Sequence, residues 1–167
     1  KIDELKKSPE FLAYEKNKSE KDQTEALLLE EERKFLSSFS EIEPALKKYC
    51  NLNPEDRLAK DYLAFPINSF KRDHSFSIIF LIDKINKSVL NDQIEMKDKK
   101  KEKILKELEK MDKSFFESFS ESFISLNSKL DSKNSALNST VLIKKLELLN
   151  KRKNALEIEK EQVQSSK

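Results

Sequence analysis

The sequence predicts an all-α fold, an antiparallel helical bundle of five to six helices with no trusted β-strand. First, the 167 residues include no Gly, whereas the tight turns of β-hairpins need positive φ and draw heavily on Gly. Second, charged residues make up 38% of the chain, against about 25% in an average globular protein, which suits helices with solvated outer faces. Third, apolar side chains recur at steps of three and four, the period of a helix.

The chain is expected to begin with a polar N-terminal tether or frayed segment over residues 1–7. A single helical domain is expected over residues 8–164, a length typical of one domain. Its first helix is expected to begin at Ser8, Pro9 and Glu10, which are suited to the N-cap, the first helical position and the first turn. A stretch of Lys, Asn and Ser at residues 16–19 is expected to interrupt this helix.

A second helix is expected to begin with a capping box at Asp22 and to run to about Ile42. Pro44 is expected to break or kink it, since proline lacks an N–H group. A short helix is expected to begin at the Asn-Pro-Glu sequence of residues 53–55 and to end before Pro66. Because Gly is missing, Asn is expected at the left-handed positions that end helices.

Residues 76–90 are the most apolar part of the chain and are expected to form a central helix that is buried nearly all round. A helix of about 30 residues is expected to follow a basic start at residues 97–103, with one apolar stripe that runs to Leu130. Residues 131–139 are expected to form a loop, and a last helix is expected after it.

Residues 115–126 read FFESFSESFISL, with Phe115, Phe119 and Phe123 at steps of four. In a strand, side chains alternate between faces, so Glu117 and Glu121 would lie on the same face as these rings. In a helix, a step of four residues turns by about 400°, so the rings form one stripe and the acids lie on the other side. The stretch therefore predicts the inner seam of a helix. The alternative is an exposed binding face or a lipid-type pocket.

Residue types that catalytic and metal sites need are scarce. His74 is the only His and Cys50 the only Cys, so the sequence offers no His-rich zinc site and no Glu-x-x-His pair for a di-iron centre. Phosphate-cradling loops and calcium loops depend on Gly. The acids Glu30, Glu31 and Glu32 point about 100° apart on a helix and are expected to form a solvated face. The sequence thus predicts no enzyme, no cofactor, no metal site and no catalytic residue.

Two basic clusters are the candidate contact residues. The net charge is only +2, with 33 basic and 31 acidic residues interleaved, which does not favour a nucleic-acid partner. Acids interrupt both clusters, so a solvated helix face is one interpretation. The other is contact with an anionic partner, such as phosphate, a heparan-type sulfate or an acidic protein surface. The candidate residues are Lys97, Lys99, Lys100, Lys101, Lys144, Lys145, Lys151, Arg152 and Lys153.

The sequence contains no stretch of about 18 apolar residues, the length that would predict a transmembrane helix. It starts KIDELKK, without an initiator Met. It is therefore expected to be a trimmed or mature form, from which any signal peptide would have been removed.

The composition and texture of the whole chain resemble a known group of proteins. The chain is rich in Lys, Asn, Ile and Phe, and it contains runs such as LKKSPEFLAYEKNKSEKD and LEKMDKSFFESFSESF. In these features it resembles the plasmid-encoded surface and exported antigens of Lyme-disease spirochaetes (Borrelia). Within that group it is most similar to the EppA/BapA exported protein family, and next to the helical complement-regulator-acquiring surface lipoproteins.

This resemblance implies a non-enzymatic, virulence-associated antigen that binds a host or vector protein during infection. It also implies a location on the cell outer membrane surface or secretion, with a lipid anchor upstream of the printed sequence if the lipoproteins are the better match. Two other functions stay open: an intracellular helical adaptor or coiled-coil interaction protein, and a nucleic-acid-associated plasmid protein. The oligomeric state also stays open.

Overall fold

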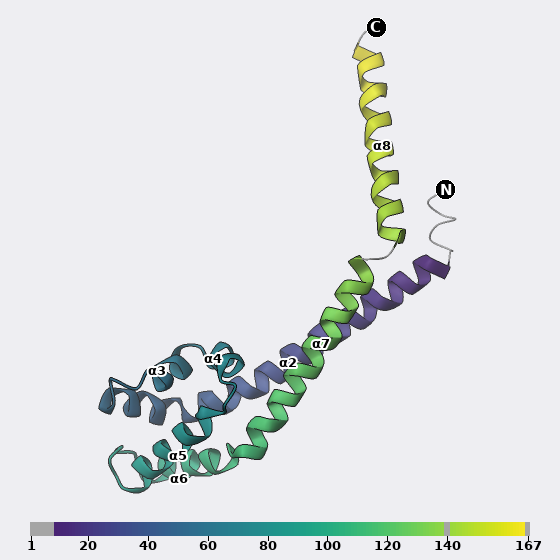
Figure 1. Ribbon diagram of the computed structural model, residues 1–167. Helices are drawn as coiled ribbons and strands as arrows, with labels where there is room; N and C mark the ends of the chain where they lie inside the picture. Colours follow the sequence, from purple (N-terminus) through teal and green to yellow (C-terminus); the bar gives the residue numbers. More distant parts are fainter. Residues whose placement is uncertain (1–8, 139–140, 166–167) are drawn as a thin grey trace. The chain divides into compact units, whose positions relative to one another are not determined.

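The computed structural model describes residues 9–138 and 141–165, which are helical almost throughout (Figure 1). In this described part there is no β-strand, and the helical content of 88% confirms the predicted all-α class. The described residues form seven helices rather than the predicted five to six. They are α2 (Pro9–Leu52), α3 (Arg57–Ala64), α4 (Pro66–Arg72), α5 (Ser77–Leu90), α6 (Asp98–Lys110), α7 (Lys113–Asn138) and α8 (Val141–Ser165).

The chain divides into two compact units, which are described separately. The core unit is Leu27–Ser125, and the terminal unit combines Lys1–Ala26 with Leu126–Lys167. Helices α2 and α7 each contribute one part to both units. The predicted tether at residues 1–7 lies outside the described residues, and the single domain predicted over residues 8–164 stays a prediction.

Helix α2 runs without interruption through three predicted boundaries. Residues 16–19 and Asp22 lie inside it, because polar side chains are tolerated on the solvated face of a helix, and it also continues past Pro44. A proline inside a helix costs about 3 kcal/mol or more. The two turns that follow Pro44 carry the buried side chains of Leu46 and Tyr49, and their burial offsets that cost. The predicted pause, second start and break are therefore wrong.

Local caps account for the helices that the sequence analysis missed. Helix α3 begins after Asp56, whose Oδ1 accepts a hydrogen bond from the N–H of Ala59 at 3.1 Å, and not at residues 53–55. Pro66 does more than end α3: it also begins α4, where its missing N–H costs nothing. The predicted helix of about 30 residues is divided in two before α7, where Asp112 Oδ1 accepts from the N–H of Phe115 at 2.9 Å.

Helix α7 also includes residues 131–138, which were predicted to form a loop, and it ends at Asn138. Tertiary contacts within the terminal unit explain this. Leu137 is buried, and the ammonium group of Lys133 forms an ion pair with the carboxylate of Glu20 on α2. These contacts stabilise a Ser- and Asn-rich segment whose composition alone favours a loop. The loop predicted for residues 131–138 is wrong, and residue 139 lies outside the described residues.

Among the described residues, positive φ angles occur at Phe76 (53°) and Asp92 (55°), not at the expected Asn residues. A left-handed conformation costs a residue with a Cβ atom about 1–2 kcal/mol. At Phe76 the neighbouring structure supports it, since its ring lies 6.0 Å from that of the buried Phe70. Packing therefore decides where the left-handed turn occurs.

Aromatic rings fill the centre of the core unit. Phe35 of α2 is fully buried and Phe123 is 4% exposed, while Phe115 and Phe119 are half-buried and pack against the same core. The prediction of an inner helix seam is therefore confirmed, and the alternative of an exposed binding face is not. Phe116 is fully buried as well, although it is not part of the predicted stripe of Phe residues spaced by four. The rings within 6.4 Å of Phe35, centroid to centroid, are Phe39, Phe70, Phe116, Phe119 and Phe123.

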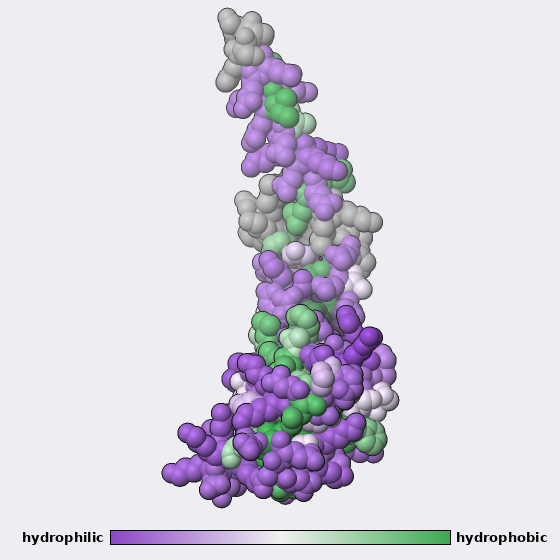
Figure 2. Space-filling view, turned by 90° about the vertical axis from the view of Figure 1, so that its left-hand side faces the viewer, coloured by the Kyte–Doolittle hydropathy of each residue, from purple (hydrophilic) through white to green (hydrophobic). Residues whose placement is uncertain are grey.

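Helix α5 confirms the predicted central helix, with Ile78, Ile82 and Ile85 buried. It is not buried all round, because Phe80 is 69% exposed and the Lys84 side chain also faces solvent. In Figure 1, α3, α4, α5 and α6 gather around the C-terminal part of α2. The visible face in Figure 2 is mostly hydrophilic, with apolar patches between the charged areas.

A buried tyrosine connects α3 to the start of α5. The hydroxyl of Tyr62 donates to Asp73 Oδ2 at 2.8 Å, and the two carboxylate oxygens of Asp73 also accept from the N–H groups of Ser77 and Ile78, each at 2.8 Å. Burial, with help from the hydrogen bond to Asp73, raises the pKa of the Tyr62 phenol well above its usual value.

Candidate functional site

A hollow of about 650 Å³ lies where the N-terminal end of α6 meets α2 in the core unit. Its lining consists of Lys48 from α2, Glu95 and Met96 from the segment before α6, Lys97 and Lys100. Lys48 Nζ donates to the backbone carbonyl of Glu95 at 2.5 Å and so connects the two sides. The lining thus contains three lysines and one glutamate, and we call this feature the basic hollow.

The predicted cluster at residues 97–101 divides according to its partners. Lys101 is half-buried, and its Nζ lies 2.7 Å from Asp92 Oδ1, so its charge is compensated. Lys97 and Lys100 line the basic hollow, and within residues 9–138 and 141–165 no ion pair joins either of them to an acid. Lys99 is exposed and is not part of the lining. Lys97, Lys99 and Lys100 are therefore the members of this cluster without an acid partner among the described residues, and of these Lys97 and Lys100 line the hollow.

The second predicted cluster belongs to the terminal unit. Lys145 of α8 lies 3.7 Å from Glu10, Nζ to Oε2, in an exposed ion pair. The side chain of Lys144 lies outside the described residues. The remaining candidates are exposed on α8: Lys151, Arg152 and Lys153.

Sequence reasoning missed Lys48, although it is essential to the hollow. The only local signal is the pair Lys47–Lys48 near the end of α2, and such a pair is common on a solvated helix face. The hydrogen bond to Glu95 spans 47 positions of the chain. The fold alone brings these residues together.

A second hollow, of about 390 Å³, lies at the corner between α3 and α4. Acids and a base share its lining, so its charge favours neither sign of ligand. One of its acids, Asp73, already accepts the three hydrogen bonds described above. The lining residues are Leu58, Asp61, Phe65, Asn68, Ser69, Arg72 and Asp73.

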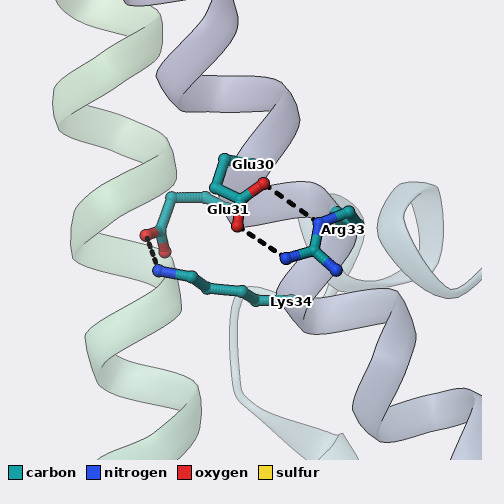
Figure 3. Close-up of polar contacts among 4 residues, drawn as sticks. All are labelled: Glu30, Glu31, Arg33 and Lys34. Atoms are coloured by element: carbon teal, nitrogen blue, oxygen red, sulfur yellow. Dashed lines mark hydrogen bonds and ion pairs between the residues drawn. The ribbon is translucent and has the colours of Figure 1, made fainter.

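The acidic run at the middle of α2 does not converge on one point (Figure 3). Glu30 accepts two hydrogen bonds from Arg33, at 3.0 Å from Nε and 2.7 Å from Nη2, and this lowers the pKa of its carboxyl group. Glu31 pairs separately with Lys34 at 3.6 Å. In the part of the chain that the structure describes, no three His, Cys, Asp or Glu side chains are placed to hold a metal ion.

The single thiol is buried, whereas the single imidazole is exposed. Cys50 is buried on α2, and burial raises the pKa of its thiol, which keeps it protonated at neutral pH. His74 is exposed in the turn before α5. Among the helices described, none combines the length and apolar character needed to cross a membrane.

Comparison of the chain with protein-family models, with curated proteins and with solved structures found no match.

Proposed function

We propose that this chain is a non-enzymatic outer-surface or exported antigen of a spirochaete, similar to the EppA/BapA exported proteins, that binds a host or vector protein during infection. The contact surface that we propose is the basic hollow, and the matching surface is an acidic region of the bound protein. The observation that carries the proposed contact surface is that Lys48, Lys97 and Lys100 line the basic hollow together with only one acidic residue, Glu95.

The lining of the basic hollow favours a protein over a nucleic acid. Single-stranded nucleic acids bind to aromatic side chains on which bases stack, and the hollow has none. Its apolar member is Met96, a flexible side chain that is often used at protein-binding surfaces. The overall charge of +2 is also low for a nucleic-acid-binding domain.

Each exposed ammonium–carboxylate contact contributes about 0.2–1 kcal/mol. Three contacts would therefore contribute about 0.6–3 kcal/mol, which is a factor of roughly 3 to 150 in affinity. Salt screens exposed charges, with a Debye length of about 10 Å at 0.1 M. The proposed binding is thus weak to moderate through this surface and strongly salt-dependent.

The resemblance also supports the remaining parts of the proposal. We place the protein on the cell outer membrane surface or in the medium, with an upstream lipid anchor in the first case. The arrangement of its helices would be an antiparallel bundle. An intracellular adaptor and a nucleic-acid-associated protein are the outcomes that the experiments below would reveal instead.

The contact surface can be tested with two charge-matched triple variants. One replaces the hollow lysines, Lys48→Glu, Lys97→Glu and Lys100→Glu. The control replaces three exposed lysines elsewhere in the core unit, and it changes the net charge by the same amount. The control substitutions are Lys60→Glu, Lys84→Glu and Lys106→Glu.

Binding of each protein to immobilised poly-L-glutamate and to a DNA duplex is measured over a range of salt concentrations. The wild type and the control are expected to bind poly-L-glutamate, and the hollow variant is expected to lose at least fivefold in affinity. Equal losses in the two variants would show that only overall charge matters. Tighter binding to DNA than to poly-L-glutamate at physiological salt would favour the nucleic-acid alternative.

A further inference from the structure

The hollow at the corner between α3 and α4, which we call the corner hollow, combines an aromatic ring with charges of both signs. Phe65 lies between the two helices and is 66% exposed. Asp61 lies one turn before it on α3, and Arg72 lies two turns after it at the end of α4. Leu58 adds an apolar side chain from α3. The corner hollow shares no lining residue with the basic hollow.

Three charged side chains line the corner hollow, and two of them have no partner within the protein. The carboxylate of Asp73 accepts three hydrogen bonds, two of them from N–H groups at the start of α5. These bonds and the N-terminal end of a helix both stabilise its negative charge. In the described part of the chain, no ion pair or side-chain hydrogen bond involves Asp61 or Arg72. One carboxylate and one guanidinium group are thus available to a ligand.

We propose that the corner hollow binds a free aromatic amino acid in its zwitterionic form. The carboxylate of the ligand pairs with Arg72, because a planar guanidinium group can donate two parallel hydrogen bonds to a carboxylate. The ammonium group of the ligand pairs with Asp61, and its ring packs against the exposed ring of Phe65. The volume of about 390 Å³ lies within the range of about 300–1,000 Å³ that is usual for small-molecule sites.

A zwitterion suits this lining better than a ligand of one charge. A simple anion attracted by Arg72 is repelled by Asp61, and a simple cation is attracted by Asp61 and repelled by Arg72. A free amino acid carries an ammonium and a carboxylate group on the same carbon atom, whereas a residue inside a peptide chain has lost both charges to amide bonds. Binding at the corner hollow does not depend on the proposed contact between the basic hollow and a protein.

Nuclear magnetic resonance of the isotope-labelled full chain, titrated with L-phenylalanine to millimolar concentration, tests the binding. The backbone amide signals of Phe65, Asn68 and Ser69 are expected to shift and to saturate. N-acetyl-L-phenylalanine lacks the ammonium charge and L-phenylalaninamide lacks the carboxylate, so each is expected to bind about fivefold more weakly. Unchanged signals at the lining, or equal affinities for the three compounds, would overturn the proposal.

Substitutions test which side chain meets which charge of the ligand. Arg72→Gln and Asp61→Asn are each expected to lower the affinity for L-phenylalanine about fivefold, with the helical circular dichroism unchanged. Arg72→Gln should also bind L-phenylalaninamide as well as L-phenylalanine, because the partner of the carboxylate is gone. Arg152→Gln and Asp131→Asn are the controls, since both residues are exposed outside the core unit. Equal affinities in the lining and control variants would contradict these contacts.

The role of the aromatic ring is tested by the preference for L-phenylalanine over L-alanine. The wild type is expected to bind L-phenylalanine more tightly, because the ring of the ligand packs against that of Phe65. Phe65→Ala is expected to lose this preference. Phe80→Ala is the control, because it removes an equally exposed ring that does not line the corner hollow. A preference that survives in Phe65→Ala would overturn the assignment of an aromatic ligand.

Discussion

Replacing Phe35 by Ala is expected to remove a large part of the stability of the core unit. The Phe35 side chain is fully buried, and its ring centroid lies 4.9 Å from those of both Phe39 and Phe70. Truncation leaves a cavity among these rings and costs about 3–5 kcal/mol. A typical domain is stable by only about 5–15 kcal/mol. The variant should therefore lose a fifth or more of its stability, and a marginal domain would lose most of it.

Urea unfolding followed by far-ultraviolet circular dichroism measures this loss. For a slope of about 2 kcal/mol per M of urea, the midpoint should fall by roughly 1.5–2.5 M. Phe80→Ala is the matched control, because the same ring is removed from a side chain that is 69% exposed in the same unit. Its free energy of unfolding should stay within about 0.5 kcal/mol of the wild type. A cost below about 1 kcal/mol at Phe35, or equal costs at both positions, would refute the aromatic core.

Two further variants test polar contacts. Tyr62→Phe removes the hydrogen bond to Asp73 and should cost about 0.5–1.5 kcal/mol at pH 8. Because the pKa of Tyr62 is raised in the folded state, wild-type stability should fall once the pH rises above about 10, where the unfolded chain ionises first. The difference in free energy of unfolding between the wild type and Tyr62→Phe should therefore become smaller as the pH rises. A constant difference would contradict this. Lys133→Met tests the hydrogen bond that lowers the pKa of Glu20. Stability from a lowered carboxyl pKa is present at neutral pH and lost on acidification. The variant should therefore melt at a lower temperature than the wild type at pH 7, whereas at pH 3 the two melting temperatures should be nearly equal.

The helical class and the aromatic seam could be predicted because both depend on local features. The lack of Gly disfavours the tight turns of β-hairpins. The spacing of four places Phe115, Phe119 and Phe123 on the same face of a helix. Helix boundaries could not be predicted as well, because tertiary contacts outweigh local preference there. The cost of Pro44 inside α2 is offset by buried side chains on the following turns. The cap at Asp112 is local, but a continuous apolar stripe across it predicts one helix.

The basic hollow could be predicted only in part. Lys97 and Lys100 stand out in the sequence as a basic run, and the structure places both in the lining. The sequence does not distinguish them from Lys101, whose charge is compensated by Asp92 through the turn before α6. Lys48 could not be found, since its position opposite the run depends on how α2 and α6 pack. Charge runs predict basic surface, but only the fold shows which members of a run converge.

The most direct test of the account is protease treatment of intact spirochaetes that produce the protein. Cells are incubated with an external protease, and the protein is followed by immunoblotting together with a periplasmic marker that reports membrane integrity. The account predicts that the cell-associated protein is degraded, or is found in the medium, while the marker stays intact. Full protection in intact cells, with degradation only after lysis, would contradict an outer-surface or exported antigen and would favour an intracellular helical adaptor.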